Sequence, residues 1–208
     1  VRAKSYLIAT GAEPTIPTIP GLEQIDYLTS TTAMELTELP ASLVVIGGGF
    51  VGLEQAQLFA RLGVEVTIIG RLAPHAEPEL SSELRKAFLT DGITVIGDRA
   101  ATITPHDDLV RVLTRTGKVA TGERVLVATG RTPRTDGLGL ATAGIATDTR
   151  GFIIVDEQQR TTNPAVFAAG DVTGGPQFVY VAAAQGRVAA RNALAATGEA
   201  LARVDYAG

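Results

Sequence analysis

The 208-residue sequence contains no cysteine, and this absence excludes several kinds of chemistry. Without thiols the chain cannot form disulfides, thiolate metal sites or a cysteine nucleophile. The two histidines, His75 and His106, are too few for a multi-histidine metal site, and each lies in a polar stretch near a proline. We therefore interpret both as surface residues, expect no metal site and assign no catalytic residue.

Long apolar runs and basic clusters are also lacking. The longest apolar run, residues 178–184, is far shorter than the roughly 20 residues of a membrane-spanning helix. The net charge is −4 with no basic cluster, so we expect neither nucleic acid nor a membrane as a partner. With 45% hydrophobic and 19% charged residues, the composition is that of a globular protein. No secretory signal pattern stands at the first residues, and we expect a cytoplasmic location.

Short apolar runs alternate with helical patterns in the first two thirds of the chain. Residues 43–46 form a continuous apolar run between a proline and several glycines, which is typical of a strand buried on both faces of a parallel sheet. Helical spacing, strand composition and breaker residues then predict the elements that follow. These are a helix over 50–62, a strand over 64–69, a helix over 78–91 and a strand over 93–96. The β-α-β-α-β order predicts an α/β, Rossmann-like parallel sheet with right-handed crossovers.

A different pattern follows in the later part of the chain. Three short runs separated by turn residues predict an antiparallel meander, and residues 124–128 return as a buried strand. The meander strands are expected at 101–104, 109–114 and 118–120, later strands at 152–155 and 166–169, and a last helix over 178–196.

One segment occurs twice. Residues 5–14 and 124–133 both contain an apolar run, Ala-Thr-Gly, two further residues and a proline. The copies are too far apart for a solenoid repeat, and they bracket the β-α-β-α-β-meander-β unit. We interpret them as the places where the chain crosses between domains. The expected domains are residues 41–130, flanked by residues 1–40 and 131–208 as parts of a second domain.

A glycine motif stands between the first strand and its helix. Gly47, Gly49 and Gly52 fit G-x-G-x-x-G, with Phe50 and Val51 between the last two glycines. In this context the glycines permit a tight turn, close approach of a pyrophosphate, and close packing of helix on strand. The helix N-terminus then offers N–H groups to the phosphates. The alternatives are a glycine-rich turn packed for steric reasons and a methyl-donor-binding variant of the fold.

The end of the second strand commonly distinguishes NAD from NADP. An acidic residue there binds the ribose 2′-hydroxyl of NAD, but this sequence has Gly70 and Arg71. Arg71 could pair with a 2′-phosphate, which favours NADP(H), whereas Gly52 mildly favours NAD. The alternative is that Arg71 is a solvent-exposed arginine.

Two acidic residues have both a structural and a functional interpretation. Glu54 lies near the start of the first helix, where the helix dipole favours an acid, but it could also accept from a nicotinamide carboxamide. Gly170 and Asp171 follow a strand, where an aspartate can bind ribityl or ribose hydroxyls, or simply form a turn or cap a helix.

The glycine motif, the two Ala-Thr-Gly segments and residues 168–171 together resemble the FAD-dependent pyridine nucleotide-disulfide oxidoreductases, in matching order and spacing over nearly the whole chain. Residues 176–184 are similar to mercuric reductases in particular, and dihydrolipoamide dehydrogenases are the nearest alternative. The resemblance implies a three-layer ββα nucleotide domain flanked by parts of a second, similar domain.

The resemblance also implies a sequence of events. NAD(P)H would bind residues 41–130, with the motif glycines at the pyrophosphate and Glu54 at the nicotinamide. A hydride would pass to FAD, with Asp171 at the ribityl region, and then electrons would pass to a cysteine pair and the substrate. Thr129 and Gly130, at the second crossing, complete the expected cofactor-binding residues. The intact enzyme would be a homodimer.

The sequence departs from the family in three respects. It has no second G-x-G-x-x-G motif, no C-x4-C redox pair and no carboxyl-terminal dimerisation domain. We therefore interpret it as a fragment that is inactive alone and that has the remainder of the FAD domain as its partner. The alternatives are a dihydrolipoamide dehydrogenase-type fragment and a non-catalytic nucleotide-binding module.

Overall fold

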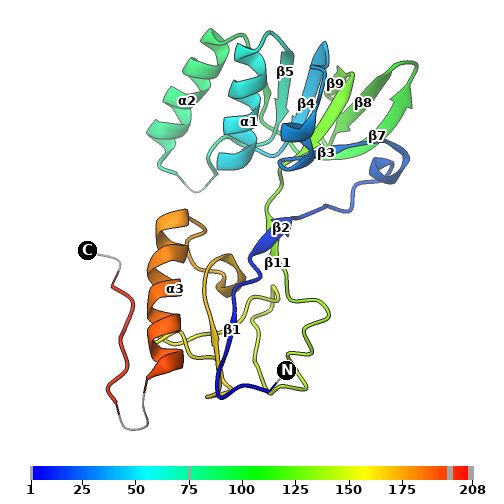
Figure 1. Cartoon of the computed structure of the whole chain (residues 1–208). Helices are drawn as coiled ribbons and strands as arrows, with labels where there is room; N and C mark the ends of the chain where they lie inside the picture. The colour runs from blue at the N-terminus through cyan, green and yellow to red at the C-terminus, as the bar shows by residue number, and fades with distance from the viewer. Residues whose placement is uncertain (1, 75, 196–198, 206–208) are drawn as a thin grey trace. The chain divides into compact units, whose positions relative to one another are not determined.

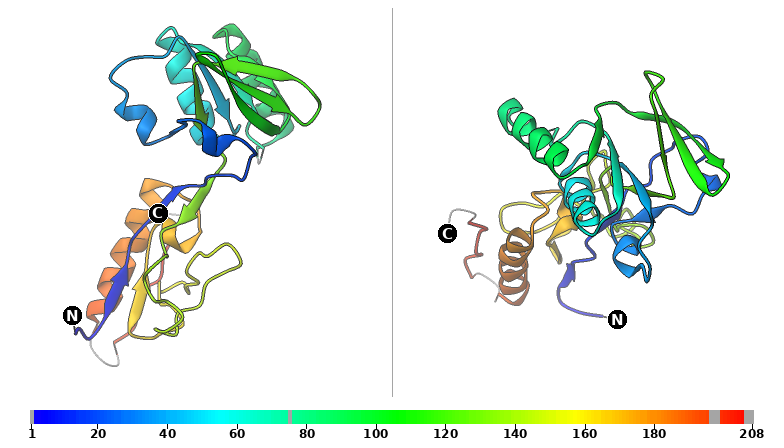
Figure 2. Two further views of the ribbon diagram at one scale, coloured as in Figure 1. Left: turned by 90° about the vertical axis from the view of Figure 1, so that its right-hand side faces the viewer. Right: turned by 90° about the horizontal axis from the view of Figure 1, so that it is seen from above.

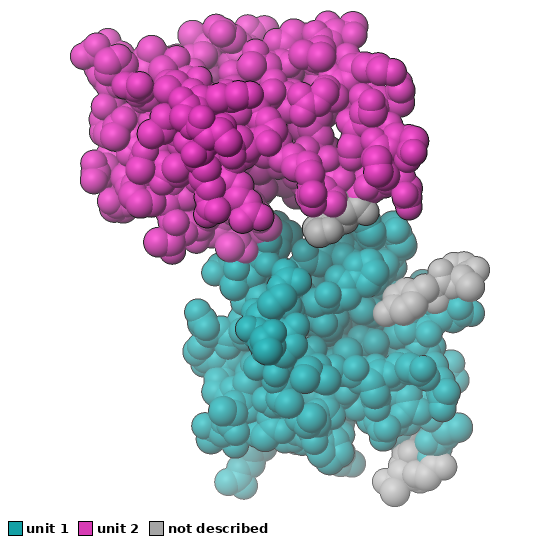
Figure 3. All heavy atoms as spheres, turned by 180° about the vertical axis from the view of Figure 1, so that it is seen from behind, with its two compact units in different colours: residues 1–13, 131–208 teal, residues 14–130 magenta. Residues whose placement is uncertain are grey.

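The computed structural model describes residues 2–74, 76–195 and 199–205, and its contacts divide the chain into two compact units (Figure 3). One unit comprises residues 14–130, and the other comprises residues 1–13 and 131–208. The first boundary of the contact units lies at 13/14, whereas the expected domain boundary is at 40/41, because residues 14–40 pack with residues 41–130. Leu22 and Leu28 are each 3% exposed in the cores of the 14–130 unit.

The 14–130 unit is built on a parallel sheet with strand order β3-β10-β4-β5-β6. The strands are β3 (Leu28–Thr29), β10 (Arg124–Val127), β4 (Ser42–Ile46), β5 (Glu65–Ile69) and β6 (Thr94–Ile96). Helix α1 (Phe50–Arg61) joins β4 to β5, and α2 (Pro78–Thr90) joins β5 to β6. The predicted β-α-β-α-β order is confirmed.

Alternate side chains of the sheet enter two separate cores. The unit is three-layered, with the helices on one face of the sheet and the meander on the other (Figures 1 and 2). On β4, Leu43 and Val45 face the helices, whereas Val44 and Ile46 face the meander. The meander is antiparallel with the order β7-β8-β9, as predicted. Its strands are β7 (Ala100–His106), β8 (Leu109–Thr114) and β9 (Val119–Gly122). Two short 3-10 helices, η1 (Leu22–Gln24) and η2 (Thr32–Glu35), precede β4.

The other unit has a smaller regular framework. Strand β1 (Tyr6–Ile8) pairs in parallel with β12 (Val166–Ala168), and α3 (Val179–Leu194) packs against both (Figure 1). The strand predicted over 152–155 does not form, apart from an isolated bridge between Thr147 and Ile153. Its amides donate to separated acceptors, Ile153 to Val172 and Ile154 to Ala146, so no continuous ladder can form.

Some predicted features lie outside the described residues, namely His75 and the end of the last helix at residue 196. Within the described ranges, no helix is both long and apolar enough to cross a membrane.

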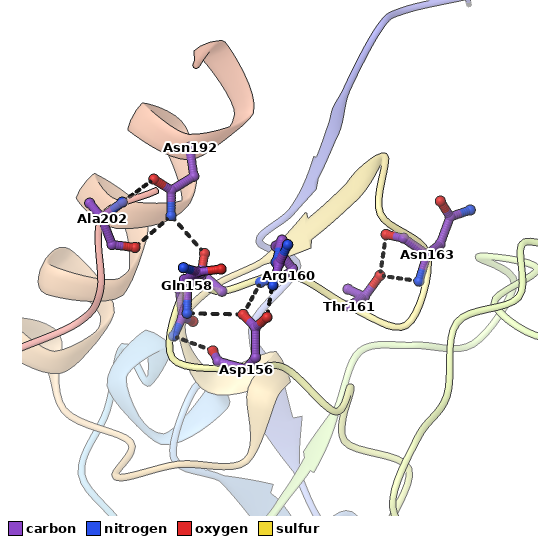
Figure 4. A network of polar contacts seen from close by, with 8 residues as sticks. Asp156, Gln158, Arg160, Thr161, Asn163, Asn192 and Ala202 are labelled. Atoms are coloured by element: carbon purple, nitrogen blue, oxygen red, sulfur yellow. Dashed lines mark hydrogen bonds and ion pairs between the residues drawn. The ribbon is translucent and has the colours of Figure 1, made fainter. Parts of the chain in front are cut away.

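A polar network holds the end of α3 against two irregular segments (Figure 4). Asn192, 5% exposed, donates to the carbonyls of Gln158 and Ala202 and accepts from the Ala202 N–H at 2.8–2.9 Å. In the adjoining turn, partial burial raises the pKa of Asp156, but hydrogen bonds from the Arg160 backbone and guanidinium and from the Gln158 N–H outweigh burial and lower it.

The two Ala-Thr-Gly copies make equivalent hydrogen bonds. The Thr129 hydroxyl donates to the Thr15 carbonyl at 3.0 Å, and the Thr10 hydroxyl donates to the Arg134 carbonyl at 2.7 Å. The Thr15 and Arg134 amides in turn donate to the glycine that follows each threonine, at 2.9 and 3.0 Å. Between these bonds, β2 (Ala12–Pro14) and β11 (Arg131–Pro133) pair in a two-stranded sheet. The repeat seen in the sequence is therefore a repeat of hydrogen bonding.

Candidate nucleotide-binding site

Gly47 directly follows β4 and turns the chain toward α1. Its φ is +122°, and a Cβ at this position would collide with the Ala128 carbonyl. Its N–H donates to the Ile69 carbonyl at 2.9 Å, which joins the turn to the end of β5. Only glycine satisfies both the backbone conformation and the close approach of β10.

Gly52 and Gly48 are also packed against backbone. A Cβ on Gly52 would collide with the Gly47 carbonyl, and a Cβ on Gly48 would collide with the Arg71 carbonyl. Gly48 also accepts a 2.7 Å hydrogen bond from the Ala73 amide. Sequence reasoning did not assign a role to Gly48, since the loop that packs against it comes from beyond β5.

Gly49 differs from its neighbours, because a Cβ there would meet no atom within 4 Å. It is the N-cap residue of α1, and no side chain caps this helix end. The first amides of a helix lack intrahelical acceptors, and the helix dipole favours an anion beside them. Neighbouring backbone therefore occupies the Cβ positions of Gly47, Gly48 and Gly52, whereas the Cβ position of Gly49 is open. An open helix N-terminus is the kind of site at which phosphates bind.

Phe50, Val51 and Glu54 lie on the first turns of α1. Phe50 is 62% exposed, Val51 is partly buried, and Glu54 is exposed. Phe50 and Glu54 are spaced i, i+4 and so share one face of the helix. Among the described residues, no hydrogen bond or ion pair engages the Glu54 carboxylate, which leaves it available to a ligand.

Gly70 has a backbone role of its own. Its φ is +155°, a Cβ would lie 2.8 Å from the Gly48 nitrogen, and its amide donates to Ile96 at 2.9 Å. A glutamate at this position would strain the turn. Arg71 is exposed, and its guanidinium donates to the Pro74 carbonyl at 3.1 Å. This single bond leaves most of its N–H donors available.

The remaining predicted residues are Thr129 and Gly130, which follow β10, and Gly170 and Asp171, which lie in the other unit. The Thr129 hydroxyl already donates to the Thr15 carbonyl. The Thr129 amide nitrogen lies close to the glycine loop, 3.2 Å from the position that a Cβ on Gly47 would occupy. Gly130, with φ +143°, accepts the Thr15 amide bond described above. Gly170 and Asp171 belong to the unit of residues 1–13 and 131–208, so the structure groups them with α3 and not with the glycine loop.

Asp171 begins the 3-10 helix η3 (Asp171–Thr173), and its side chain does not cap that helix. Its Oδ2 lies 3.6 Å from Arg131 Nε, and the Arg131 Nη2 donates to the Ala12 carbonyl at 2.5 Å. The Gly170 amide donates at 2.8 Å to Gln185 of α3, which is 3% exposed. Sequence reasoning missed Arg131 and Gln185; the position of Arg131 directly after the second Ala-Thr-Gly was the available signal.

No group of three or more His, Asp and Glu residues within the described part of the chain could hold a metal ion.

Residues 1–186 match the family model described as pyridine nucleotide-disulphide oxidoreductase, so the chain belongs to this family. It is 52% identical over 200 residues to a mercuric reductase of Streptomyces lividans, covering 93% of this chain and 42% of that relative. It is 44% identical over 201 residues to a mercuric reductase of Bacillus cereus, covering 93% of this chain and 32% of that relative.

Solved structures agree with this assignment. The HOCl-induced flavoprotein disulfide reductase RclA of Escherichia coli has a TM-score of 0.88 and 32% identity, covering 98% of this chain and 47% of that one. LpdA from Mycobacterium tuberculosis has a TM-score of 0.85 and 32% identity, covering 98% and 44%. The expected fold class and family resemblance are confirmed, and the chain spans less than half the length of these relatives.

Proposed function

We propose that residues 14–130 bind NADP(H), and that the chain is the part of an FAD-dependent mercuric-ion reductase that delivers the hydride of NADPH to the flavin. The observation that carries the nucleotide site is the contrast within one loop. Neighbouring backbone occupies the Cβ positions of Gly47, Gly48 and Gly52, whereas the Cβ position of Gly49 is open and lies at an uncapped helix N-terminus. The pyrophosphate would lie at Gly49 and accept from the first amides of α1, beside Phe50 and Val51.

Glu54 is proposed to accept from the nicotinamide carboxamide, because it is exposed and shares the Phe50 face of α1. A carboxylate that accepts from an amide N–H makes a charge-assisted hydrogen bond, which orients the ring as well as binding it.

The residues around Asp171 fit a contribution to an FAD site. The side chain is 27% exposed, and its contact with Arg131 leaves carboxylate oxygens able to accept from ribityl hydroxyls. Arg131 is itself anchored on the Ala12 carbonyl, which places its positive charge beside the carboxylate. FAD, when bound, would supply the acceptor for the hydride.

Arg71 is proposed to select NADP(H). A charge-assisted contact with the 2′-phosphate contributes about 1.5–3 kcal/mol, which corresponds to roughly 10- to 150-fold in affinity. An acidic side chain in place of Gly70 would be strained, and with glycine there no carboxylate repels a 2′-phosphate at this position.

The nucleotide site is tested by placing a methyl group at its open point. Gly49→Ala should leave the free energy of unfolding within about 0.5 kcal/mol of wild type, because the methyl meets no protein atom. It should nevertheless weaken NADPH binding about 10-fold or more in a calorimetric titration, which is a loss of at least ~1.4 kcal/mol. Gly186→Ala in α3 is the matched control, since its methyl group also meets nothing within 4 Å. Unchanged NADPH affinity in Gly49→Ala would contradict the site.

The coenzyme preference is tested with Arg71→Ala against Arg61→Ala. Arg61 lies at the opposite end of α1 and has a surface ion pair with Asp91. Arg71→Ala should weaken NADPH and spare NADH, while Arg61→Ala should change neither affinity. Equal binding of both nucleotides by the wild-type chain would refute the preference.

The mercuric-ion assignment rests on the identity with mercuric reductases and is tested in a chimera. Residues 1–208 replace the matching segment of the Streptomyces lividans enzyme, and the chimera should reduce mercuric ion with NADPH. A chimera that binds FAD and oxidises NADPH without reducing mercuric ion would contradict the assignment. The 208-residue chain alone, with FAD added, should be inactive, because it has no thiol to pass electrons to mercuric ion.

A further inference from the structure

A second guanidinium lies near the end of the sheet that carries Arg71. Arg85 belongs to α2 and is exposed, yet its Nη2 approaches Gly97, the residue directly after β6. A methyl group on Gly97 would lie 3.4 Å from this nitrogen. Within the described residues, Arg85 makes no hydrogen bond or ion pair. Its charge is therefore positioned at the carboxyl end of β6 without a protein partner.

The carboxyl ends of β5 and β6 are direct neighbours. Ile69 and Ile96 are register partners, and the Gly70 amide donates to the Ile96 carbonyl at 2.9 Å. Adjacent strands are roughly 5 Å apart. Arg71 follows Gly70 just beyond β5, and Gly97 follows Ile96 directly beyond β6. The two residues therefore lie on neighbouring strand ends at the same edge of the sheet.

The face of α2 that carries Arg85 contacts the loop that follows β5 and carries Arg71. Ser81 is spaced i, i+4 with Arg85, so the two side chains share a face. The Ser81 hydroxyl donates at 3.3 Å to the carbonyl of Ala73, two residues after Arg71. The α2 face that carries Ser81 and Arg85 is therefore joined to the loop that follows β5 and carries Arg71.

The carboxylate next to Gly97 is already engaged within the protein. Asp98 accepts from the Arg99 amide at 2.7 Å and from the Thr116 amide and hydroxyl at 2.8 and 2.7 Å. These bonds direct the Asp98 carboxylate to the β8–β9 turn, and it does not pair with Arg85.

We propose that Arg85 is a second specificity-determining residue, which binds the 2′-phosphate of NADP(H) together with Arg71. This inference rests on the proposed NADP(H) function and adds a residue to it. A phosphate monoester near neutral pH carries more than one negative charge and three acceptor oxygens, so it can engage two guanidinium groups at once. On this fold the adenosine ribose of a dinucleotide lies at the end of the second strand, here β5, beside the loop that carries Arg71.

The test compares Arg85→Ala with Lys86→Ala in the full chain, by titration with NADPH and with NADH. Both changes remove one positive charge from α2 and put a strong helix former in its place. Lys86 pairs with Glu83 at 2.7 Å and has no place in the proposed site. Arg85→Ala should weaken NADPH binding by about 5- to 20-fold and leave NADH unchanged, and Arg85→Lys should restore part of the loss. Lys86→Ala should bind both nucleotides as the wild type does.

The outcomes separate this inference from the function on which it rests. If the wild type prefers NADPH and Arg71→Ala removes the preference, but Arg85→Ala behaves like Lys86→Ala, then Arg85 has no role and this inference alone fails. Equal weakening of NADPH and NADH by Arg85→Ala also overturns it. A wild-type chain that binds neither nucleotide overturns the proposed function and this inference together.

Discussion

The two units of this chain are held together in different ways. In the 14–130 unit, five parallel strands separate two apolar cores, and strands β4 and β10 contribute side chains to both of them. In the unit of residues 1–13 and 131–208, two strands and α3 enclose two much smaller apolar clusters. The second unit relies instead on polar side chains that bind backbone groups in its turns. Examples are Asp148, Asp156, Asn163 and Asn192.

This difference determines which substitutions each unit can tolerate. Burial of apolar surface is non-directional, whereas a buried polar side chain must meet its partners with correct geometry. We therefore expect the 14–130 unit to lose stability mainly when a substitution causes steric conflict in its packed glycine loop. The other unit should fail mainly through loss of single hydrogen-bonding side chains.

The largest effect is expected for Gly47→Ala. A Cβ at Gly47 would collide with the Ala128 carbonyl, and the φ of Gly47, +122°, is unfavourable for any other residue. The free energy of unfolding should therefore fall by about 3 kcal/mol or more. Hydrogen exchange should show faster opening of β4 and β5 and unchanged protection in α3. Gly49→Ala is the control two residues away, and equal loss of stability in both variants would show that the loop is not packed as described.

Asn192→Ala should have the next largest effect, and in the other unit. The change removes three hydrogen bonds and leaves the Gln158 and Ala202 carbonyls without their donor. We expect a loss of about 2–3 kcal/mol, seen as faster hydrogen exchange in α3 with β4 unaffected. Leu194→Ala, at a position 86% exposed on the same helix, should change little. If the two variants are equally stable, the polar network does not hold this unit together.

The sequence predicted β4, β5 and β10 because each contains a buried apolar run, and it predicted α1 and α2 because each has a periodic apolar face. It did not predict the boundary at residue 14. Strand β3 has only two residues, and its pairing with β10 depends on contacts across the unit. The segment 152–155, predicted as a strand, contains the buried residues Phe152 and Ile153. The amides of this segment donate hydrogen bonds to separate parts of the chain, so no strand pairing forms. Burial alone did not distinguish a strand from an irregular buried segment.

The same limit applies to the candidate site. The spacing of Gly47, Gly49 and Gly52 predicted a turn followed by a helix, which the structure contains. The packing of Gly48 against the Arg71 carbonyl and the approach of Arg85 to Gly97 join residues from different elements. No local pattern marks such pairs, since they meet only when the sheet forms.

Asp98 gives the 14–130 unit a polar connection that depends on pH. Hydrogen bonds, led by that of the Thr116 hydroxyl, hold the pKa of Asp98 well below its usual range. A carboxyl group with a lowered folded-state pKa stabilises the fold above its unfolded pKa of about 3.9, and this stabilisation is lost as the pH falls further. Asp98→Asn should therefore lower the melting temperature near pH 7, and the difference from wild type should shrink below about pH 4.

The control for this prediction is Asp107→Asn, in an exposed turn where asparagine also tolerates the positive φ of 52°. It should leave the melting temperature near that of wild type at both pH values. A difference between Asp98→Asn and wild type that stays constant down to pH 2 would contradict the role of the ionised carboxylate.

The smallest effects are expected at the repeated threonines, and they test whether Thr129 belongs to the cofactor site. Thr10→Val and Thr129→Val each remove one exposed hydroxyl bond to a backbone carbonyl, so each should cost about 0.5–1 kcal/mol of unfolding free energy. Because the Thr129 hydroxyl already donates to Thr15, its loss should leave NADPH affinity unchanged. Thr18→Val, at another exposed threonine, is the control for the added methyl group. Weaker NADPH binding in Thr129→Val but not in Thr10→Val would instead make Thr129 a nucleotide ligand. The equivalence of the two copies would then be limited to their backbone bonds.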